Sequence, residues 1–364
     1  MLQVGIVGLP NVGKSSLFNA LTAAGAPAEN YPFCTVDPNI GTVEVPDPRL
    51  ERIRSIAGSR ESVPTFIRFV DIAGLVEGAS RGEGLGNQFL GQIREVDAIA
   101  HVLRCFEDPD VTHVMGSVDP GRDRGVVETE LILADLESVD RRIEKVEKKA
   151  RSGEKEPIRE MKALEPVFRA LESGKAVREL GLSHADLEII QGLDLLSLKP
   201  VLYVLNVAEE EVGGSGDRIP RIDGVPGMEA GAAVVPISLA LESELALLEP
   251  EERAEFLSEM GLQEDCASRV IRGAFQLLGL ITFFTTNEKQ ATAWAIPRGT
   301  KAPEAAGVIH TDFQRGFIRA ETIGFEEFAR LGGIKEARDE GAIRSEGKDY
   351  VVADGDILLI RFNV

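Results

Sequence analysis

The sequence predicts an α/β protein with a doubly wound sheet, an antiparallel coiled-coil hairpin inserted into it, and a small α+β domain at the C-terminus. Three observations support this prediction. Short apolar runs alternate with helical patterns, a glycine-rich motif follows the first of these runs, and a heptad-like spacing fills residues 132–171. A chain of 364 residues is long enough for two or three domains, each with its own core.

Six short apolar runs have the length of strands, and helical patterns lie between them. These runs are Leu2–Val7, Gly41–Val45, Phe66–Val70, Ala98–Leu103, Val201–Leu205 and Ala232–Ile237. Alternation of strand and helix is typical of a doubly wound sheet. We therefore expect the first and fifth runs, although far apart in the chain, to belong to one sheet.

The long segment between the fourth and fifth runs has a helical period. Its apolar residues recur alternately four and three positions apart, which predicts two helices packed as an antiparallel coiled coil. The first helix would use Ile132, Leu136, Val139, Ile143, Val146 and Ala150, and the second Met161, Leu164, Phe168 and Leu171. A break is expected at Arg151–Pro157.

The first arm of this hairpin is strongly basic. It carries Arg141, Arg142, Lys145, Lys148, Lys149 and Arg151. Such a run suits a binding surface for an anionic partner, and it equally suits a solvated helix face. The sequence leaves these two interpretations open.

Helical patterns follow the sixth apolar run, at Glu242–Leu248, Glu251–Met260 and Glu264–Leu278. From about Gly279 the pattern changes to four short strands around one helix, Gly324–Leu331. The strands are Ile281–Thr285, Ala293–Ile296, Phe317–Ile323 and Ile357–Phe362. We therefore expect a nucleotide-binding domain over 1–128 and 198–278, a helical insert over 129–197, and a separate domain over 279–364.

Composition restricts the possible partners and surroundings. Forty Lys and Arg against 60 Asp and Glu give a net charge of −20, which argues against indiscriminate binding to nucleic-acid phosphates. Cys34, Cys105 and Cys266 form no disulfide framework, so we expect reduced thiols. No signal peptide or membrane-spanning run is visible. The expectation is a cytoplasmic protein, and a monomer, without membrane contact.

The motif after the first run is the most specific signal in the chain. Gly8-Leu-Pro-Asn-Val-Gly-Lys-Ser15 fits G-x-x-x-x-G-K-[ST] between a strand and a helix, which predicts a phosphate loop. Its backbone N–H groups would surround the phosphates of a nucleoside triphosphate. Lys14 would reach the β- and γ-phosphates, and Ser15 would bind Mg²⁺. The expected phosphate-binding residues are Asn11, Val12, Gly13, Lys14, Ser15 and Ser16.

A phosphate loop alone could belong to a kinase, a transporter ATPase or a switch GTPase. The third apolar run ends in Asp71-Ile-Ala-Gly74, an Asp-x-x-Gly motif. Asp71 would reach Mg²⁺ through water, and the Gly74 N–H would bond the γ-phosphate, so this segment would sense that phosphate. Between the two motifs, Thr35 is the expected second Mg²⁺ ligand, in a first switch loop. A turn-capping role is its structural alternative.

Base recognition is expected after the fifth run, at Asn206-Val207-Ala208-Glu209. Switch GTPases have Asn-Lys-x-Asp there, and the Asp accepts two hydrogen bonds from guanine. Glu209 is one methylene longer, so the paired contact is misaligned and adenine can compete. Asn206 can bond N7 and the N6 amine of adenine. Ser238 and Leu239 would close over the base from the loop that follows the sixth run.

These motifs together resemble the YchF family of ribosome-binding ATPases, within the Obg-related GTPases. The similarity rests on Gly8–Ser16, Asp71–Val76, Gly82–Phe89, Asn206–Glu209, the helical insert and His310–Arg319, and it covers essentially the whole chain. It implies a P-loop switch that accepts ATP, with GTP as the alternative nucleotide, requires Mg²⁺ and associates with the ribosome or a ribosomal subunit. It also implies that the C-terminal domain is TGS-like, with a β-grasp fold. The segment Ser238-Leu-Ala-Leu-Glu stands where family members often have small residues, so we expect a less sharp base preference.

Leu75 stands where Ras-like enzymes place a water-orienting Gln, so slow intrinsic hydrolysis is expected. The resemblance suggests a K⁺ held near the phosphates by Asn11 as compensation. His113 is the candidate water-orienting residue within this chain, and a structural role is its alternative. The leading function is a slow, ribosome-linked ATPase. An Obg-type GTPase in subunit assembly, and a nucleotide-gated binding module with incidental hydrolysis, remain open.

Overall fold

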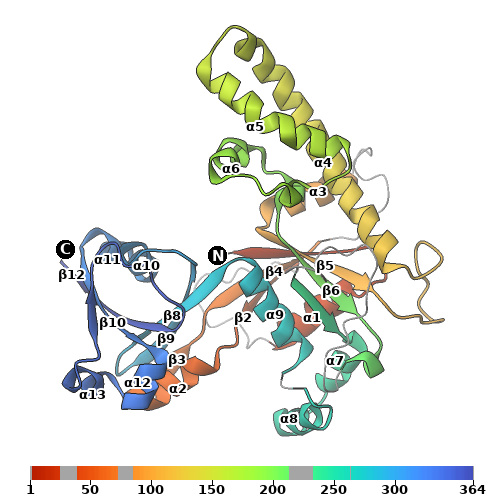
Figure 1. Ribbon diagram of the computed structural model, residues 1–364. Helices are drawn as coiled ribbons and strands as arrows, with labels where there is room; N and C mark the ends of the chain where they lie inside the picture. The colour runs from red at the N-terminus through yellow and green to blue at the C-terminus, as the bar shows by residue number, and fades with distance from the viewer. Residues whose placement is uncertain (1, 25–38, 73–84, 213–232, 263, 364) are drawn as a thin grey trace.

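The computed structural model describes residues 2–24, 39–72, 85–212, 233–262 and 264–363. Within these residues the chain forms two six-stranded sheets and one long helical hairpin that projects from the first sheet (Figure 1). The two sheets have different origins in the sequence. The first uses strands from residues 3–237, and the second uses strands from the C-terminal third plus one short strand from near residue 60.

The first sheet has the strand order β2-β4-β1-β5-β6-β7. Its strands are β1 (Gln3–Val7), β2 (Ile40–Glu44), β4 (Phe66–Asp71), β5 (Ala98–Arg104), β6 (Val201–Asn206) and β7 (Ala233–Ile237). All six predicted strands are confirmed to within two residues. Five of them are parallel, and β2 runs antiparallel to β4 at the edge. The carboxyl ends of the parallel strands therefore meet at one edge of the sheet.

Helices from the same parts of the chain as these strands pack against this sheet. They are α1 (Lys14–Ala24), α3 (Leu85–Glu95), α7 (Leu239–Leu245), α8 (Pro250–Glu259) and α9 (Cys266–Leu277). Fully buried Ile6, Phe69 and Leu205 lie in the core between strands and helices. Because the central strands are covered on both faces, they read as nearly continuous apolar runs in the sequence.

The hairpin consists of α4 (Pro120–Arg151) and α5 (Lys155–Glu172), which pack antiparallel. Both predicted arms are confirmed, but the expected break over Arg151–Pro157 is too long. Only residues 152–154 form the turn, and Pro157 lies in the first turn of α5, where a proline needs no hydrogen-bond partner. Short helical turns follow. They are η2 (Val177–Leu180), α6 (His184–Ile190), η3 (Gln191–Leu193), η4 (Leu196–Leu198) and, after β6, η5 (Glu209–Glu211).

Helix α4 also crosses the expected boundary between residues 128 and 129. It is continuous for 32 residues. Its inner part packs into the core of the first sheet through Val127, Leu131 and Ala134, whereas Val139 and the outer part pack against α5. Asp135 fixes the junction, because its buried carboxylate accepts hydrogen bonds from the N–H groups of Leu196 and Ser197 at 2.8 and 2.7 Å.

The second sheet has the order β11-β10-β12-β8-β9-β3. Its strands are β3 (Glu61–Val63), β8 (Leu280–Thr286), β9 (Gln290–Pro297), β10 (Phe317–Gly324), β11 (Arg344–Glu346) and β12 (Asp356–Phe362). The four predicted strands are confirmed. The expectation of one helix is wrong, because four pack here: α10 (Ala302–Ile309), α11 (Thr311–Arg315), α12 (Phe325–Leu331) and α13 (Ile334–Asp339). All four have eight residues or fewer, and the three that the sequence did not predict, α10, α11 and α13, are too short to show a clear helical period.

A segment from the first third of the chain belongs to this second sheet. Strand β3 pairs with β9, and α2 (Pro48–Ala57) packs on the same body through Leu50 and Ile53. Arg49 on α2 forms an ion pair with Asp354 at 2.7 Å. The expected boundaries placed this segment inside the nucleotide-binding domain. Local sequence could not show otherwise, because the pairing joins residues more than 200 positions apart.

Two of the three cysteines lie in the described residues, and both are free thiols, as expected. Burial raises the pKa of Cys105 and of Cys266 to about 12, which makes both thiols unreactive near neutral pH. Cys34 lies outside the described residues. None of the helices in the described part of the chain combines the length and apolar character needed to cross a bilayer.

Candidate functional site

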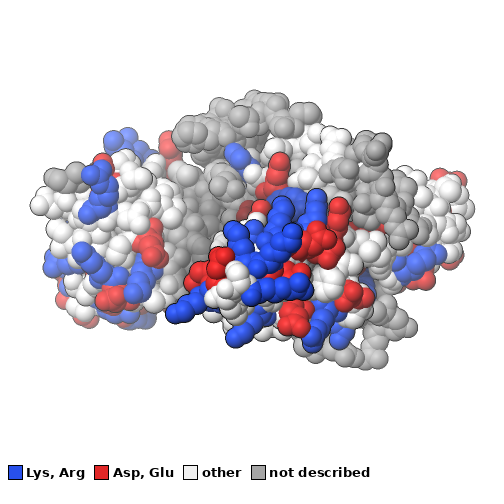
Figure 2. Space-filling view, turned by 90° about the horizontal axis from the view of Figure 1, so that it is seen from above, with Lys and Arg blue, Asp and Glu red and all other residues white. Residues whose placement is uncertain are grey.

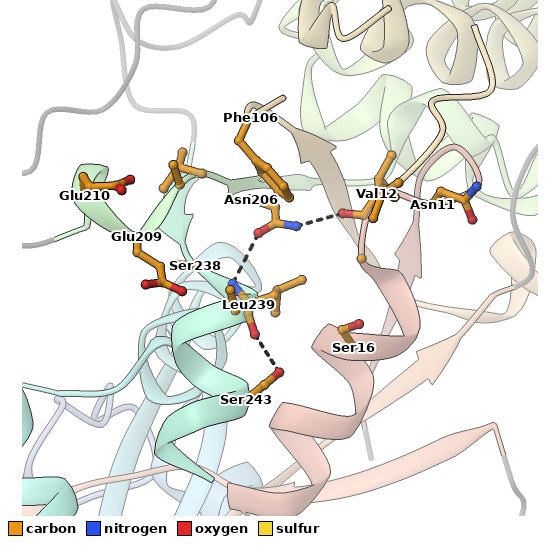
Figure 3. A pocket seen from close by; sticks show the side chains of 15 residues that line it. Asn11, Val12, Ser16, Phe106, Asn206, Glu209, Glu210, Ser238, Leu239 and Ser243 are labelled. Carbon is orange, nitrogen blue, oxygen red and sulfur yellow. Dashed lines mark hydrogen bonds between the residues drawn. The ribbon is translucent and has the colours of Figure 1, made fainter. Parts of the chain in front are cut away.

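Most of the predicted site residues that the structure describes gather at the carboxyl edge of the first sheet. A cavity of about 560 Å³ opens there, between the loop after β1, the loop after β6 and the start of α7 (Figure 3). This volume suits a small organic ligand such as a nucleotide. Its walls are formed by Asn11, Val12, Gly13, Ser16, Phe106, Val111, Asn206, Val207, Ala208, Glu209, Glu210, Ser238, Leu239, Ala240 and Ser243.

The loop from Gly8 to Gly13 has the backbone that a phosphate loop requires. Asn11 adopts φ 61° and Gly13 φ 105°, two left-handed conformations that turn successive N–H groups inward. Gly13 is also close to its neighbours. A Cβ atom there would lie 2.5 Å from Leu239 Cδ1 and 2.9 Å from Asn206 Nδ2. The second glycine of the motif is thus required both by its backbone angles and by the lack of space.

Lys14, the first residue of α1, is almost fully buried inside this loop. Its Nζ donates a hydrogen bond to the carbonyl oxygen of Leu9 at 2.8 Å. Burial lowers the pKa of this ammonium, and the nearby carboxylate of Asp71 partly opposes the shift. The position fits the predicted role, because the ammonium lies within the turn that would enclose the phosphates.

The structure brings two of the predicted Mg²⁺ ligands together. Ser15 and Asp71 are 56 positions apart, yet Ser15 Oγ donates to Asp71 Oδ2 at 3.1 Å. The sheet explains the contact, because β1 and β4 are parallel neighbours and Asp71 pairs with Ile6, just before the loop. A hydroxyl and a carboxylate are hard oxygen ligands, so these residues fit Mg²⁺. Thr35, Gly74 and Leu75 lie outside the described residues.

At the base end, Asn206 has a structural role that the sequence interpretation missed. Its Nδ2 donates to the carbonyl oxygen of Val12 at 3.1 Å, and its Oδ1 accepts from the N–H of Leu239 at 3.3 Å (Figure 3). One side chain therefore connects the phosphate loop to the start of α7. Asn206 also lines the cavity, so one amide N–H and one oxygen lone pair remain for a ligand.

The other predicted base-recognition residues divide into buried and exposed ones. Val207 is 2% exposed, and its N–H donates to the carbonyl of Ile237. Ser238 is buried as the N-cap of α7, where its hydroxyl accepts from the Leu241 N–H at 3.3 Å. Glu209 is exposed at the rim of the cavity, beside Glu210. Of these three side chains, only the Glu209 carboxylate is exposed at the cavity rim.

Comparisons with known proteins agree with this geometry. A family model described as a 50S ribosome-binding GTPase matches residues 3–158, and a model for the YchF GTPase C-terminal region, described as a protein of unknown function, matches residues 280–363. Proteins named "Ribosome-binding ATPase YchF" from Escherichia coli O157:H7 and Bacillus subtilis are 50% and 48% identical, over all of this chain and at least 99% of theirs. The chain belongs to the YchF family.

A solved structure supports the same assignment. The Schizosaccharomyces pombe YchF GTPase is 35% identical and superposes with a TM-score of 0.85, covering 99% of this chain and 97% of the other. A protein named "Obg-like ATPase 1" from Oryza sativa is 44% identical over all of this chain and 92% of its own length. The P-loop fold and the C-terminal domain therefore both belong to this YchF architecture.

A second missed element of this YchF chain is the loop after β5. Arg104, at the end of that strand, is 1% exposed and donates to three backbone carbonyls of the loop. The acceptors are Phe106, Asp108 and Val111, at 3.1, 3.2 and 2.8 Å. Phe106 and Val111 line the cavity. The available signal was a charged residue at the end of the strand Ala98–Arg104, which is apolar apart from His101.

His113 lies in the same loop, but its side chain does not face the cavity. It is 7% exposed, its Nδ1 accepts from the Met115 N–H at 3.2 Å, and its Nε2 lies 2.8 Å from Asp123 Oδ2. The neighbouring Thr112 carbonyl does reach the phosphate loop, because it accepts from Asn11 Nδ2 at 3.2 Å. This arrangement fits the structural role that the sequence analysis gave as the alternative for His113. A catalytic role would require the His113 side chain to leave its contact with Asp123.

Proposed function

We propose that this chain is a ribosome-associated P-loop ATPase, a switch that hydrolyses the γ-phosphate of ATP slowly. One observation carries the proposal: Lys14, the Ser15–Asp71 contact and an inward-turned phosphate loop meet at the edge of the sheet, beside a cavity of nucleotide size. The names of the YchF relatives, which are ribosome-binding ATPases, support the choice of partner and nucleotide.

The phosphate end would bind by charge and backbone N–H groups. Lys14 would exchange the Leu9 carbonyl for the β- and γ-phosphates. Ser15 directly, and Asp71 through water, would hold Mg²⁺, which supplies positive charge against the phosphate oxygens. Thr35 and Gly74 are proposed to complete the site when the γ-phosphate is present. The Asn11 amide oxygen suits a K⁺, since its Nδ2 already contacts Thr112.

The base end would favour ATP or accept both nucleotides. Glu209 replaces the shorter Asp that reads guanine, and no lysine is available at the buried position 207. Asn206 offers its remaining amide groups to the base, and the apolar walls contributed by Phe106 and Leu239 do not distinguish adenine from guanine. A calorimetric titration with ATP and GTP side by side measures this preference directly.

The ribosome contact is proposed at the tip of the hairpin. Seen from above, Lys and Arg gather there, interspersed with acidic residues (Figure 2). Arg142 is paired with Glu160 and Arg151 with Glu147, both at 2.5 Å, which places part of the basic charge within the hairpin. Lys145, Lys148 and Lys149 are exposed and form no ion pair within the described residues. These three lysines are the best candidates for contacts with ribosomal RNA.

Pelleting through a sucrose cushion tests this contact. We expect binding to ribosomes that differs among an ATP analogue, ADP and no nucleotide, and that weakens as salt rises. Changing Lys145, Lys148 and Lys149 to Glu should reduce pelleting and leave ATP affinity intact. The same three positions changed to Arg keep the charge and are the matched control. Pelleting in none of the three nucleotide states would overturn the ribosome assignment, and equal pelleting in all would overturn the switch.

A second candidate function is a nucleotide-gated binding module with incidental hydrolysis. The burial of His113 favours it, because no water-orienting side chain within the described residues faces the phosphate loop. Multiple turnover measured with and without ribosomes separates the two. A turnover that ribosomes do not raise above the basal rate would favour the binding module.

A further inference from the structure

The loop between β5 and α4 links the nucleotide cavity to the hairpin. Arg104 fixes the first half of this loop through three backbone carbonyls, and Phe106 and Val111 form part of the cavity wall. Thr112 then contacts Asn11 of the phosphate loop at 3.2 Å. The residue directly before His113 is thus in contact with the nucleotide site.

The His113 imidazole is held on the other side of this loop by one hydrogen bond and one close contact with a carboxylate. Its Nδ1 accepts a hydrogen bond from the Met115 N–H, so the proton is on Nε2. Nε2 lies 2.8 Å from Asp123 Oδ2, a close contact between two buried atoms that is not aligned as a hydrogen bond. The side chains of His113 and Asp123 are only 3% and 1% exposed. Neither ring nitrogen has a lone pair available to orient a water molecule.

Asp123 belongs to the hairpin and is itself held firmly. It lies in the first turn of α4, and its Oδ1 accepts from Arg122 Nη2 at 3.0 Å. Arg122 also donates to the Ser117 carbonyl at 2.6 Å, which ties the end of the loop to the same turn. Helix α4 then continues without a break to Lys145, Lys148 and Lys149 near its outer end, about 33–39 Å from Asp123 at 1.5 Å per residue.

We propose that Asp123 is a positioning residue through which the hairpin controls His113. In this structure Asp123 holds the imidazole away from the nucleotide. A partner that binds the outer end of α4 displaces the first turn of this helix. The His113 side chain is then released and turns toward the phosphates beside Thr112. This inference rests on the proposed ATPase, and it identifies the contact through which ribosome binding stimulates that activity.

Release changes what His113 can do in hydrolysis. A free ring nitrogen accepts a hydrogen bond from the attacking water. The water oxygen forms a bond to the γ-phosphorus, the bond to the β–γ bridging oxygen breaks, that oxygen leaves on ADP with its electron pair, and the water proton departs with inorganic phosphate. The apolar Leu75 cannot orient this water.

The test compares Asp123→Asn with the wild-type chain. Replacing the carboxylate by an amide keeps the shape but removes the negative charge that lies 2.8 Å from the His113 Nε2. We expect basal ATP turnover to rise about fivefold, the stimulation by ribosomes to fall, and ATP affinity to stay unchanged. Asp119→Asn is the matched control, because Asn caps α4 equally well and Asp119 does not touch His113.

A second readout is independent of ribosomes and of turnover. Diethyl pyrocarbonate modifies accessible imidazoles, and mass spectrometry resolves the four histidines. We expect His113 to be protected in the wild type and modified in Asp123→Asn and Asp123→Ala. Adding Asp123→Asn to His113→Ala should not change turnover further, because Asp123 acts through His113.

Distinct results would overturn distinct claims. If Asp123→Asn lowers basal turnover, or leaves turnover and His113 modification unchanged, the positioning role is wrong. A folded Asp123→Ala chain, verified by its melting temperature, in which His113 stays protected would contradict it as well. Failure of the wild type to bind ribosomes would instead overturn the proposed partner, and the effects on basal turnover and modification would still report on Asp123.

Discussion

The two ends of the nucleotide cavity are built by different means. At the phosphate end, a backbone with two left-handed residues, a buried ammonium and a carboxylate define the site. At the base end, the groups are neutral or exposed: the Asn206 amide, the apolar walls and the Glu209 carboxylate at the rim. We expect the phosphate end to supply most of the affinity and the base end to supply a modest preference.

This difference explains why the phosphate end of the site can be predicted from the sequence and the base end cannot. A phosphate loop needs particular residues at fixed spacing, since its backbone angles and its lysine are local requirements. Base selection depends on distances between loops after β6 and β7, which are set by tertiary packing. Asn206 shows this most clearly, because its two partners lie 194 and 33 positions away.

The largest effect is expected from Lys14→Ala. It removes the point charge that the phosphates require, so ATP binding should weaken by at least about 100-fold, and turnover should be lost. Lys199→Ala is the matched control. Lys199 is partly buried, whereas Lys14 is almost fully buried. In both, burial lowers the pKa, and Lys199 Nζ donates to the Arg94 carbonyl at 3.1 Å, away from the cavity. Calorimetry should show intact ATP binding in the control, and equal losses in both variants would contradict the phosphate assignment.

Asn206→Ala tests whether the two ends are independent. The change leaves the Val12 carbonyl and the Leu239 N–H without their partner in a buried place, so we expect a loss of about 2 kcal/mol, or roughly 30-fold in ATP affinity. Ser238→Ala removes a neighbouring helix cap and leaves the Asn206 contacts in place. If Asn206→Ala shifts only the preference between ATP and GTP, without weakening both, then Asn206 reads the base and does not support the phosphate loop.

The fold was predictable where its signals are local. All strands of the first sheet and both hairpin arms follow from apolar periodicity. The assignment of α2 and β3 to the second sheet was not predictable, because it depends on pairing with β9 and on the Arg49–Asp354 ion pair, between residues far apart in the chain. His113 was identified as a candidate, but its partner Asp123 lies in a helix whose start the coiled-coil spacing did not reveal.

The stability of the folded chain should also depend on pH, through a histidine next to the phosphate loop. His101 on β5 pairs with Val7, directly before the phosphate loop, and burial together with Arg178, Arg124 and Lys14 lowers its pKa to about 3. Its unfolded value is near 6.5, so below that pH the unfolded chain binds a proton that the folded chain does not. Stability is therefore lost as pH falls from about 6.5 toward 3, by about 1.4 kcal/mol per pH unit for this group.

Replacing His101 should make the free energy of unfolding depend less steeply on pH. The leucine in His101→Leu cannot be protonated, so the free energy of unfolding should fall less steeply as the pH drops from 6 to 4. The difference in slope should correspond to the uptake of about one proton on unfolding. Urea titrations at several pH values give the slope. His184→Leu is the control, since His184 is exposed and solvated in both the folded and unfolded chains. An unchanged slope in His101→Leu would mean that His101 is not the group that titrates.

The smallest effect is expected at the base end. Glu209 is exposed, so Glu209→Asp shortens the carboxylate toward the guanine-reading geometry without disturbing the fold. We expect the ratio of ATP to GTP affinity to move toward GTP by less than about tenfold, or 1.4 kcal/mol.

Adding a lysine at position 207 is not a clean test, because Val207 is 2% exposed and the stem of a lysine would have to be buried there. Glu210→Asp, at the same rim, is the matched control and should leave the ratio unchanged. A wild-type chain that binds GTP more than about tenfold tighter than ATP would contradict the base assignment, and would mean that guanine is read by groups other than the Glu209 carboxylate.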